Sequence, residues 1–275
     1  MSEGGPGACR IVWWGHATVE VRLDGARFVT DPLLRRRVGP LRSTGHRPRS
    51  ADVGTAGLGS VDAVLLSHLH RDHTDLPSLR RFPARTRVVG PRGSGRVVHA
   101  GTRRRVEELS VGEQTQVGSV QVTATWADHD GRRHTRGPVN AQAVGYLLSG
   151  SHTVYFAGDT DLFDDMADIG RRPGGRLDVA LLPVSGWGLT LGPGHMDAER
   201  AAEAVSLLRP RLAVPIHWGT LRVPVVWRSK RELLGPGAAE RFATIVADTS
   251  PGTVVVVPVP GRVIETVPMP NGSSR

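Results

Sequence analysis

Short apolar runs recur along the chain, separated by polar and glycine-containing turns. Most of the runs are too short for helices, so they predict strands. The predicted strands are residues 10–14, 19–23, 27–30, 61–67, 87–89, 106–109, 117–125, 142–148, 153–157, 178–183, 212–216, 253–258 and 262–267. Asp24-Gly25 lies between the second and third runs and is a hairpin signal. The run at 61–67 is typical of a strand buried on both faces.

Helices are predicted at fewer places. The strongest spans residues 197–208, where Asp197 can cap the first turn and Pro210 stops the last. The other predicted helical segments are 76–81, 162–169 and 236–249. The glycine-rich segment 90–95 lacks the lysine of a phosphate-binding loop and predicts a turn. Many strands with a few helices between them predict an α/β layered domain, in which two sheets form the core and helices lie outside.

The ends of the chain and one internal stretch have low-order composition. We expect a disordered N-terminus at 1–9, a single domain at 10–267, a flexible tail at 268–275 and a long surface loop at 35–59. The N-terminus has no apolar signal region, and the longest apolar run, 254–260, is too short for a bilayer span. A lone cysteine, Cys9, excludes a disulfide framework. The sequence therefore predicts a soluble cytoplasmic protein without a membrane span.

The net charge says less about function than its size suggests. The chain carries 35 basic and 26 acidic residues, for a net charge of +9 and a pI of about 11.1. Lys230 is the only lysine, so the other basic residues are arginines. This bias indicates a GC-rich, bacterial coding genome, and compositional drift can raise the arginine content without a nucleic-acid partner. The arginines are interpreted as scattered along the chain.

The decisive pattern is a string of metal-binding side chains at 67–73, which reads SHLHRDH. His68 and His70 lie two residues apart and point the same way on an extended backbone. Asp72 and His73 follow after the chain turns and can face a second point nearby. Imidazole and carboxylate together suit zinc or another first-row divalent metal. A solvated histidine-rich loop is the alternative, but it does not need this spacing directly after a buried strand.

Three further side chains follow predicted strands in the same way. They are His129, Asp159 and His217, each just after the C-terminal end of a strand. Open α/β sheets place their sites at such ends. Each alone has an ordinary structural explanation, as a surface residue, a turn former or a core histidine. With the string at 68–73 they supply seven donors, enough for two metals and one bridging carboxylate.

The His-x-His-x-Asp-His string at 68–73 resembles the signature of the metallo-β-lactamase superfamily. Three local strings resemble one branch of it, which holds N-acyl-phosphatidylethanolamine-hydrolysing phospholipase D and L-ascorbate-6-phosphate lactonase. They are WGHAT at 14–18, TDP at 30–32 and PIHWGT at 215–220. The resemblance covers most of the chain and implies a four-layer αββα sandwich.

The resemblance also implies a role for each candidate residue. The ligands of one metal would be His68, His70 and His129, and those of the other would be Asp72, His73 and His217. Asp159 would bridge the two metals, and Asp72 would also orient the attacking water. His16 and Asp31 would lie beside the site as supporting groups, and His195 would face the substrate. The metals would be two divalent ions, with zinc as the default and manganese or iron as alternatives.

These residues predict a dinuclear hydrolase that attacks with a metal-bridging hydroxide. Its expected substrate is a small anionic phosphoester or phosphodiester, because the loops after 30–32 and at 128–133 are charged and aromatic residues make up only 5%. The resemblance also makes a homo-oligomer plausible.

Three alternatives stay open at this point. The first is a lactonase that acts on a sugar-phosphate-type lactone. The second is a metal-dependent nuclease, which the basic pI favours and the scattered arginines disfavour. The short spacing between Asp159 and His217 also leaves little room for an inserted nucleic-acid-clamping domain. The third is a non-enzymatic metal-binding protein, which a complete ligand set disfavours.

Overall fold

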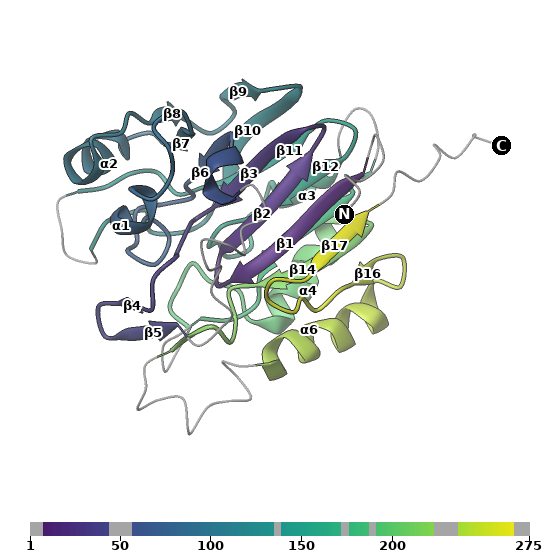
Figure 1. Ribbon diagram of the computed structural model, residues 1–275. Coiled ribbons are helices and arrows are strands. Elements are labelled where there is room, and N and C mark those ends of the chain that lie inside the picture. The colour runs from purple at the N-terminus through teal and green to yellow at the C-terminus, as the bar shows by residue number, and fades with distance from the viewer. Residues whose placement is uncertain are drawn as a thin grey trace.

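Two mixed sheets packed face to face form the centre of the molecule (Figure 1). The structure is a computed structural model of the 275-residue chain. It describes residues 8–43, 57–134, 139–171, 176–186, 191–222 and 236–266. The expected disordered N-terminus and C-terminal tail lie outside these residues, except that Cys9 already belongs to the first strand.

The first sheet joins an antiparallel half to a parallel half. Its strand order is β17 (Val263–Thr266), β1 (Cys9–Gly15), β2 (Thr18–Leu23), β3 (Ala26–Thr30), β6 (Ala63–Leu65), β7 (Arg87–Pro91) and β8 (Glu107–Leu109). The strands from β17 to β3 are antiparallel, and those from β3 to β8 are parallel. The predicted hairpin joins β2 to β3, and both Asp24 and Gly25 take a positive φ there, as this turn type requires.

The second sheet has the same mixed character. Its order is β16 (Val254–Val255), β14 (Leu212–Ile216), β13 (Val179–Pro183), β12 (Thr153–Phe156), β11 (Val144–Ser149), β10 (Val120–Trp126) and β9 (Gln114–Val117). The strands from β9 to β12 are antiparallel, and those from β12 to β16 are parallel. Apolar side chains from both sheets meet in one core, which includes Ile11, Trp13, Val122, Tyr146 and Phe156.

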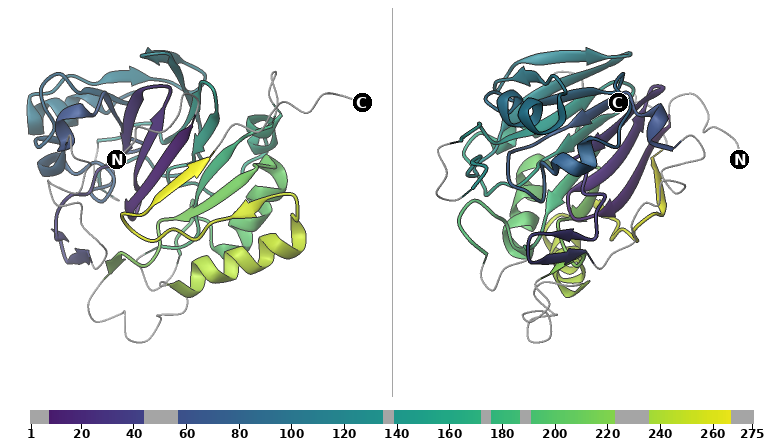
Figure 2. Two further views of the ribbon diagram at one scale, coloured as in Figure 1. Left: turned by 45° about the vertical axis from the view of Figure 1, so that its right-hand side comes forward. Right: turned by 60° about the vertical axis from the view of Figure 1, so that its left-hand side comes forward.

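Helices cover the outer faces of both sheets. The first sheet carries α1 (Leu76–Leu79) and α2 (Gly95–Thr102), packed on its parallel half through a second apolar cluster. On the second sheet lie α3 (Met166–Gly170), α4 (Ala198–Leu208) and α6 (Pro236–Thr249). The two helical layers lie on opposite sides of the sheets (Figures 1 and 2). This order confirms the predicted four-layer αββα sandwich. None of the helices in the described ranges has the length and apolarity of a bilayer span.

The predicted local structure contains three errors: two predictions were wrong and one helix was missed. The run at 117–125 is two strands, because Gly118 takes a φ of +60° and folds Val120 back onto Val117. The loop expected at 35–59 contains the hairpin of β4 (Arg37–Val38) and β5 (Leu41–Ser43), which pairs with β15 (Leu221–Arg222), and a short 3-10 helix, η1 (Gly57–Ser60). Residues 44–56 of that loop lie outside the described part. The third error concerns the start of α2.

The segment at 90–95 forms the expected turn, and it also contains the start of α2, whose N-cap is Ser94. Gly95 and Gly101 weaken the helix signal in the sequence. Packing supplies the missing stability, since Val98 is buried in the apolar cluster shared with α1. Gly101 also allows close packing of the two helices, because a Cβ there would overlap the Leu76 side chain on α1, which would have to shift.

Candidate metal centre

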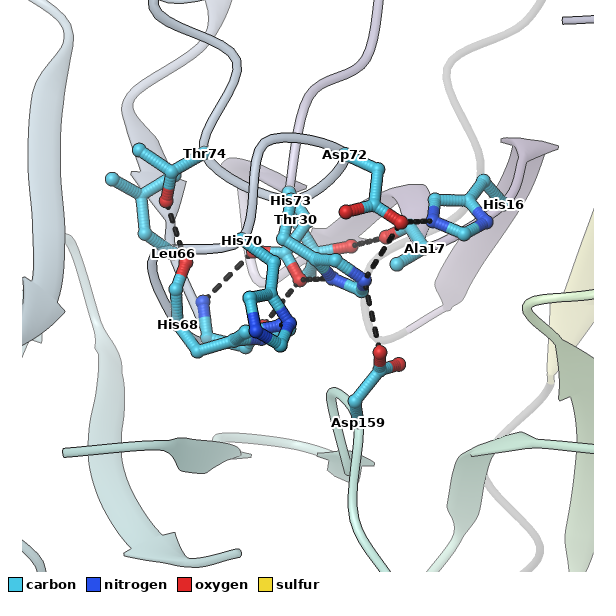
Figure 3. A network of polar contacts seen from close by, with 12 residues as sticks. His16, Ala17, Thr30, Leu66, His68, His70, Asp72, His73, Thr74 and Asp159 are labelled. Carbon is cyan, nitrogen blue, oxygen red and sulfur yellow. Dashed lines mark hydrogen bonds and ion pairs between the residues drawn. The ribbon is translucent and has the colours of Figure 1, made fainter. Parts of the chain in front are cut away.

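The loops that follow β6, β10, β12 and β14 meet at one end of the sandwich. They bring together all seven predicted metal ligands, and the turn between β1 and β2 adds His16. Figure 3 shows His16 with the predicted ligands His68, His70, Asp72, His73 and Asp159. Within the described residues, four overlapping groups of histidine and aspartate side chains place their donor atoms within 4.8 Å of one another. The strands are buried and regular, so they fix where each loop begins.

Three imidazole nitrogens converge in the first group. His70 Nδ1 lies 2.9 Å from His68 Nε2 and 3.1 Å from His129 Nε2. Burial lowers the pKa of His68 and His70, and it lowers the pKa of His129 to about 4. All three rings are therefore neutral at pH 7 and can offer lone pairs.

The outer nitrogens of these rings fix their tautomers. Ser67 Oγ donates to Asp31 Oδ2 at 2.5 Å, so it accepts from His68 Nδ1 at 2.9 Å. His129 Nδ1 donates to the Gly194 carbonyl at 2.7 Å. Each Nε2 must therefore carry a lone pair that points inward, toward His70. Converging lone pairs repel unless a cation lies between them, so the donor set fits a metal ion.

The second group is centred on His73. Its Nε2 lies 3.3 Å from His217 Nε2, 3.1 Å from Asp159 Oδ2 and 3.9 Å from Asp72 Oδ2. His217 Nδ1 donates to the Ser185 carbonyl at 2.7 Å, so its Nε2 lone pair also points inward. Burial lowers the pKa of His217 to about 3.

Asp159 lies between the two groups. Its Oδ1 is 3.2 Å from His217 Nε2, yet it is buried and has no hydrogen-bond partner in the described part of the chain. Burial opposes its charge, but His217 and His73 hold the pKa of this carboxyl well below its usual range. Burial also opposes a charge on His73, but the carboxylates of Asp159 and Asp31 raise the pKa of His73 well above its usual value. The protein thus gathers negative charge where a cation would compensate it.

Asp31 and His16 support this arrangement from opposite sides. Asp31 Oδ1 accepts from the Ser67 backbone N–H at 2.8 Å, and its Oδ2 accepts from His73 Nδ1 at 2.8 Å. His16 Nε2 lies 3.0 Å from Asp72 Oδ2, which helps to hold the pKa of that buried carboxyl below its usual range. Carboxylate partners of this kind orient ligand imidazoles and raise their basicity.

His16 is held in an uncommon backbone conformation. Its φ is +52°, in the left-handed region that non-glycine residues seldom adopt. Three hydrogen bonds fix the peptide: Trp13 Nε1 and the His217 N–H both donate to the His16 carbonyl, and the His16 N–H donates to Thr220 Oγ1. Its ring centroid lies 3.9 Å from that of His217. The donor atoms of His16, Asp72, His73 and His217 form one of the four groups. A ring nitrogen of His16 is therefore close enough to the other three donors to bind the same metal ion.

His195 is partly exposed, as are His70 and His129. Its Nδ1 faces the carbonyl oxygens of Gly192 and Pro193, and its Nε2 lies 3.6 Å from Asp159 Oδ2. Its side chain is 24% exposed, whereas that of Asp159 is 3% exposed. It lines a cleft of about 460 Å³ together with His70, Asp72, Asp159 and His217.

The cleft has two chemically different walls. Arg71 and Arg133 line one wall, and Arg133 is fixed by donating to the carbonyl oxygens of Leu69 and Thr74. The other wall is apolar and includes residues of the β4–β5 hairpin and the 191–195 segment: Val38, Pro40, Leu41 and Leu191.

The supporting groups that the sequence did not reveal are mostly main-chain atoms. The carbonyls of Gly194 and Ser185 orient His129 and His217, and no side-chain motif marks a carbonyl. Ser67 was detectable in principle, because it directly precedes His68 in the motif. Thr220 was inside the 215–220 string but had no role assigned to it.

Replacing Gly194 with alanine is expected to weaken metal binding about 10–100-fold, the usual cost of disturbing an outer partner of a ligand. Gly194 has a φ of +74°, and a Cβ there would lie 3.0 Å from both Asp128 O and His129 Nδ1. Competition with a chelator measures the affinity for Zn²⁺. Gly192→Ala is the matched control, because its Cβ would meet nothing within 4 Å. Equal affinities in the two variants would contradict the role given to the Gly194 carbonyl.

Comparison with known proteins places the chain in a family. A model of the beta-lactamase superfamily domain matches residues 26–218. A UPF0173 metal-dependent hydrolase of Methanopyrus kandleri is 34% identical over 77% of this chain and 84% of its own length. An uncharacterized protein of Mycobacterium tuberculosis is 31% identical over 94% of this chain and 69% of its own length.

A solved structure shows the same fold. Igni18, a metallo hydrolase from the archaeon Ignicoccus hospitalis, superposes with a TM-score of 0.71 at 22% identity, covering 94% of this chain and 98% of its own. The histidine and aspartate cluster, the αββα layers and these relatives agree with one another. The chain therefore belongs to the metallo-β-lactamase superfamily and, within it, to the UPF0173 group of metal-dependent hydrolases.

Proposed function

We propose that the protein is a dinuclear hydrolase of small phosphoesters or phosphodiesters. It resembles the branch that holds the phospholipase D and the ascorbate-6-phosphate lactonase in its 14–18, 30–32 and 215–220 strings. The observation that carries the proposal is the position of Asp159, which lies between two groups of inward-facing donors. Its oxygens contact His73 and His217 of the second group, and a carboxylate oxygen also lies within 4.8 Å of a ring nitrogen of His129 in the first group, so this one carboxylate is placed to serve two cations.

The proposed ligand sets follow the two groups. His68, His70 and His129 would hold one ion, Asp72, His73 and His217 the other, and Asp159 would bridge them. Imidazole and carboxylate donors favour zinc, while manganese or iron also fit. When bound, two such ions supply Lewis acidity and make water a nucleophile at neutral pH. His16 could serve as a further donor to the second ion through Nε2.

The protein's own side chains would position the reactants. Asp72 is ionised and held by His16, so its oxygens can accept a hydrogen bond from the attacking water and orient it. His195 Nδ1 donates to a main-chain carbonyl, so its Nε2 faces the cleft as an acceptor when neutral and as a donor when protonated. At the rim of the site this nitrogen can contact the leaving group of the substrate.

The walls of the cleft support an anionic substrate. Arg71 is exposed beside the site, and its guanidinium can pair with a phosphate or carboxylate. Arg133 adds a fixed positive charge on the same wall. The opposite apolar wall can accept the uncharged part of such a molecule.

Metal analysis followed by a substrate panel tests this proposal. The purified protein is expected to hold close to two equivalents of metal and to hydrolyse bis-p-nitrophenyl phosphate. Two equivalents with turnover of lactones only would favour the lactonase. Less than half an equivalent, after reconstitution with zinc and manganese, would contradict the dinuclear site.

Replacing Arg71 with alanine is expected to raise the KM for an anionic substrate about tenfold, the scale of one charge-assisted hydrogen bond of about 1.5 kcal/mol. Turnover should change little, because Arg71 does not contact the donor groups. Steady-state kinetics on a charged ester and its neutral analogue measure the effect. Arg132→Ala is the control, since Arg132 is exposed, pairs with Asp130 and does not line the cleft. An equal rise in KM for both substrates would contradict the role of Arg71.

A further inference from the structure

One segment carries an excess of positive charge equal to the net charge of the whole chain. Residues 76–106 contain nine arginines and no aspartate or glutamate. The remaining residues hold 26 basic and 26 acidic side chains, so their charges balance. The other 25 arginines are scattered along the chain, whereas these nine lie within 31 residues that contain no acidic side chain.

The fold collects this charge on one face. Residues 76–106 form α1 and α2, which lie on the outer side of the first sheet, β7 within that sheet, and the loops between them (Figures 1 and 2). The opposite helical layer, with α3, α4 and α6, holds both signs of charge and pairs them. Its arginine and carboxylate pairs include Arg171–Asp168, Arg200–Asp161 and Arg241–Glu199.

Carboxylates neutralise little of the charge on the basic face. Arg87 pairs with Glu107 and Arg92 with Glu113. Three others bind main-chain carbonyl oxygens, which leave the positive charge in place; they are Arg80, Arg81 and Arg104. In the described part of the chain, three more contact no carboxylate; they are Arg96, Arg103 and Arg105, all exposed.

A concave site lies within this face. A groove of about 500 Å³ runs between residues 84–88 and 103–107. Its lining includes one carboxylate residue, Glu107, and five arginines: Arg85, Arg87, Arg103, Arg104 and Arg105. Hydrogen bonds fix Arg87 and Arg104, whereas Arg103 and Arg105 are exposed. The groove shares no lining residue with the catalytic cleft. Guanidinium groups arranged in this way match phosphate geometry.

We propose that this face, defined by the arginines of residues 76–106, binds the phosphate backbone of double-stranded nucleic acid. Among the described residues, none of the exposed large apolar side chains lies in 76–106, so nothing on the face can insert into a bilayer. Phe82 is the segment's only aromatic residue and is 5% exposed, so the face lacks the stacking platforms that single-strand binders use. Unpaired arginines without apolar or aromatic neighbours favour contact with phosphates alone, which is independent of base sequence.

A triple variant tests the proposal. Arg96→Gln, Arg103→Gln and Arg105→Gln together remove three charges, and in the described part of the chain no side-chain hydrogen bond or ion pair of these arginines is lost with them. The metal-loaded protein is mixed with a labelled 30-base-pair DNA duplex, and the dissociation constant is measured by fluorescence polarisation over a range of NaCl concentrations. The wild type is expected to bind with strong salt dependence. The variant should bind at least about tenfold more weakly, and its slope of log K against log salt should fall by about 2 to 3, near 0.9 for each lost phosphate contact.

A second triple variant controls for net charge. Arg171→Gln, Arg241→Gln and Arg262→Gln remove the same three charges from other exposed positions and should leave the affinity within about twofold. Equal weakening by both variants would overturn the proposal, because the effect would then come from net charge alone. Absence of binding by the wild type at 50 mM NaCl would also overturn it. A third outcome would overturn it as well: the wild type binds phosphatidylglycerol vesicles more tightly than the duplex, and the first triple variant no longer binds the vesicles. The face would then bind a membrane surface.

Discussion

Replacing Asp159 with alanine is expected to lower turnover by more than about 100-fold and to reduce the metal content below one equivalent. Losing an outer partner of a ligand costs about 10–100-fold, and Asp159 contacts two proposed ligands directly and lies within 4.8 Å of His129, so its loss should exceed that range. His73 and His217 would then face each other at 3.3 Å, and their group would keep the carboxylate of Asp72 but lose that of Asp159. Elemental analysis and turnover of bis-p-nitrophenyl phosphate measure the two effects on the same sample.

Asp164→Ala is the matched control for this change. Asp164 lies in the same connection after β12, but it is exposed and outside the four donor groups. This variant should keep the metal content and turnover of the wild type. Circular dichroism should show that both variants keep the fold, because Asp159 contributes no main-chain hydrogen bond to the sheets. An Asp159→Ala protein with two equivalents of metal and full turnover would contradict the bridging role.

Replacing Glu20 with glutamine is expected to lower the free energy of unfolding by about 3 kcal/mol, because it leaves a buried guanidinium without its carboxylate. Glu20 on β2 accepts from Arg27 Nε at 3.0 Å and Nη2 at 2.9 Å, and from Arg22 Nε at 2.7 Å. The side chains of Glu20 and Arg27 are only 2% and 5% exposed. Urea unfolding monitored by circular dichroism measures the change.

This contribution of Glu20 should depend on pH. Burial would raise the pKa of the Glu20 carboxyl, but the guanidinium groups of Arg27 and Arg22 lower it below its usual value. The ion pair therefore stabilises the fold fully above the pKa of an unfolded glutamate, about 4.3, and loses this effect as the pH falls through the lower pKa of the folded state. The difference in stability between wild type and Glu20→Gln should shrink below about pH 4.

Glu265→Gln serves as the control for Glu20. Glu265 pairs with Arg10, and the side chains of Arg10 and Glu265 are 28% and 54% exposed. Breaking this exposed pair should lower the free energy of unfolding by less than about 1 kcal/mol. If Glu20→Gln and Glu265→Gln had the same free energy of unfolding at pH 7, the buried ion pair would make no net contribution to stability.

Local patterns in the sequence predicted the elements that depend on neighbouring residues. The Asp24-Gly25 turn, the Asp197 cap of α4 and the 68–73 string all act within a few positions, and the structure contains each of them. The assignment of individual ligands to two ions stays a prediction. It depends on which lone pairs face a bound cation, and the order of residues in the chain does not determine this.

Features that depend on distant residues were not predictable in the same way. The β4–β5 hairpin is stabilised by β15, whose Leu221 pairs with Ser43 far earlier in the chain. The helix α2 contains two glycines and forms because Val98 packs beneath it. The orienting carbonyls of Gly194 and Ser185 belong to loops whose course follows from the whole fold. In each case tertiary packing overrides a weak local signal.

The pairing of β17 with β1 has a consequence for how the chain folds. Cys9 lies opposite Thr266, and Val12 lies opposite Val263. During synthesis on the ribosome, the β1 edge of the first sheet therefore stays open until nearly the whole chain has emerged. Closing such a distant contact is slow, and an open strand edge can pair with another chain in the meantime. Folding of this protein should end with the docking of its last strand, so intermediates that lack β17 are the species most prone to aggregate.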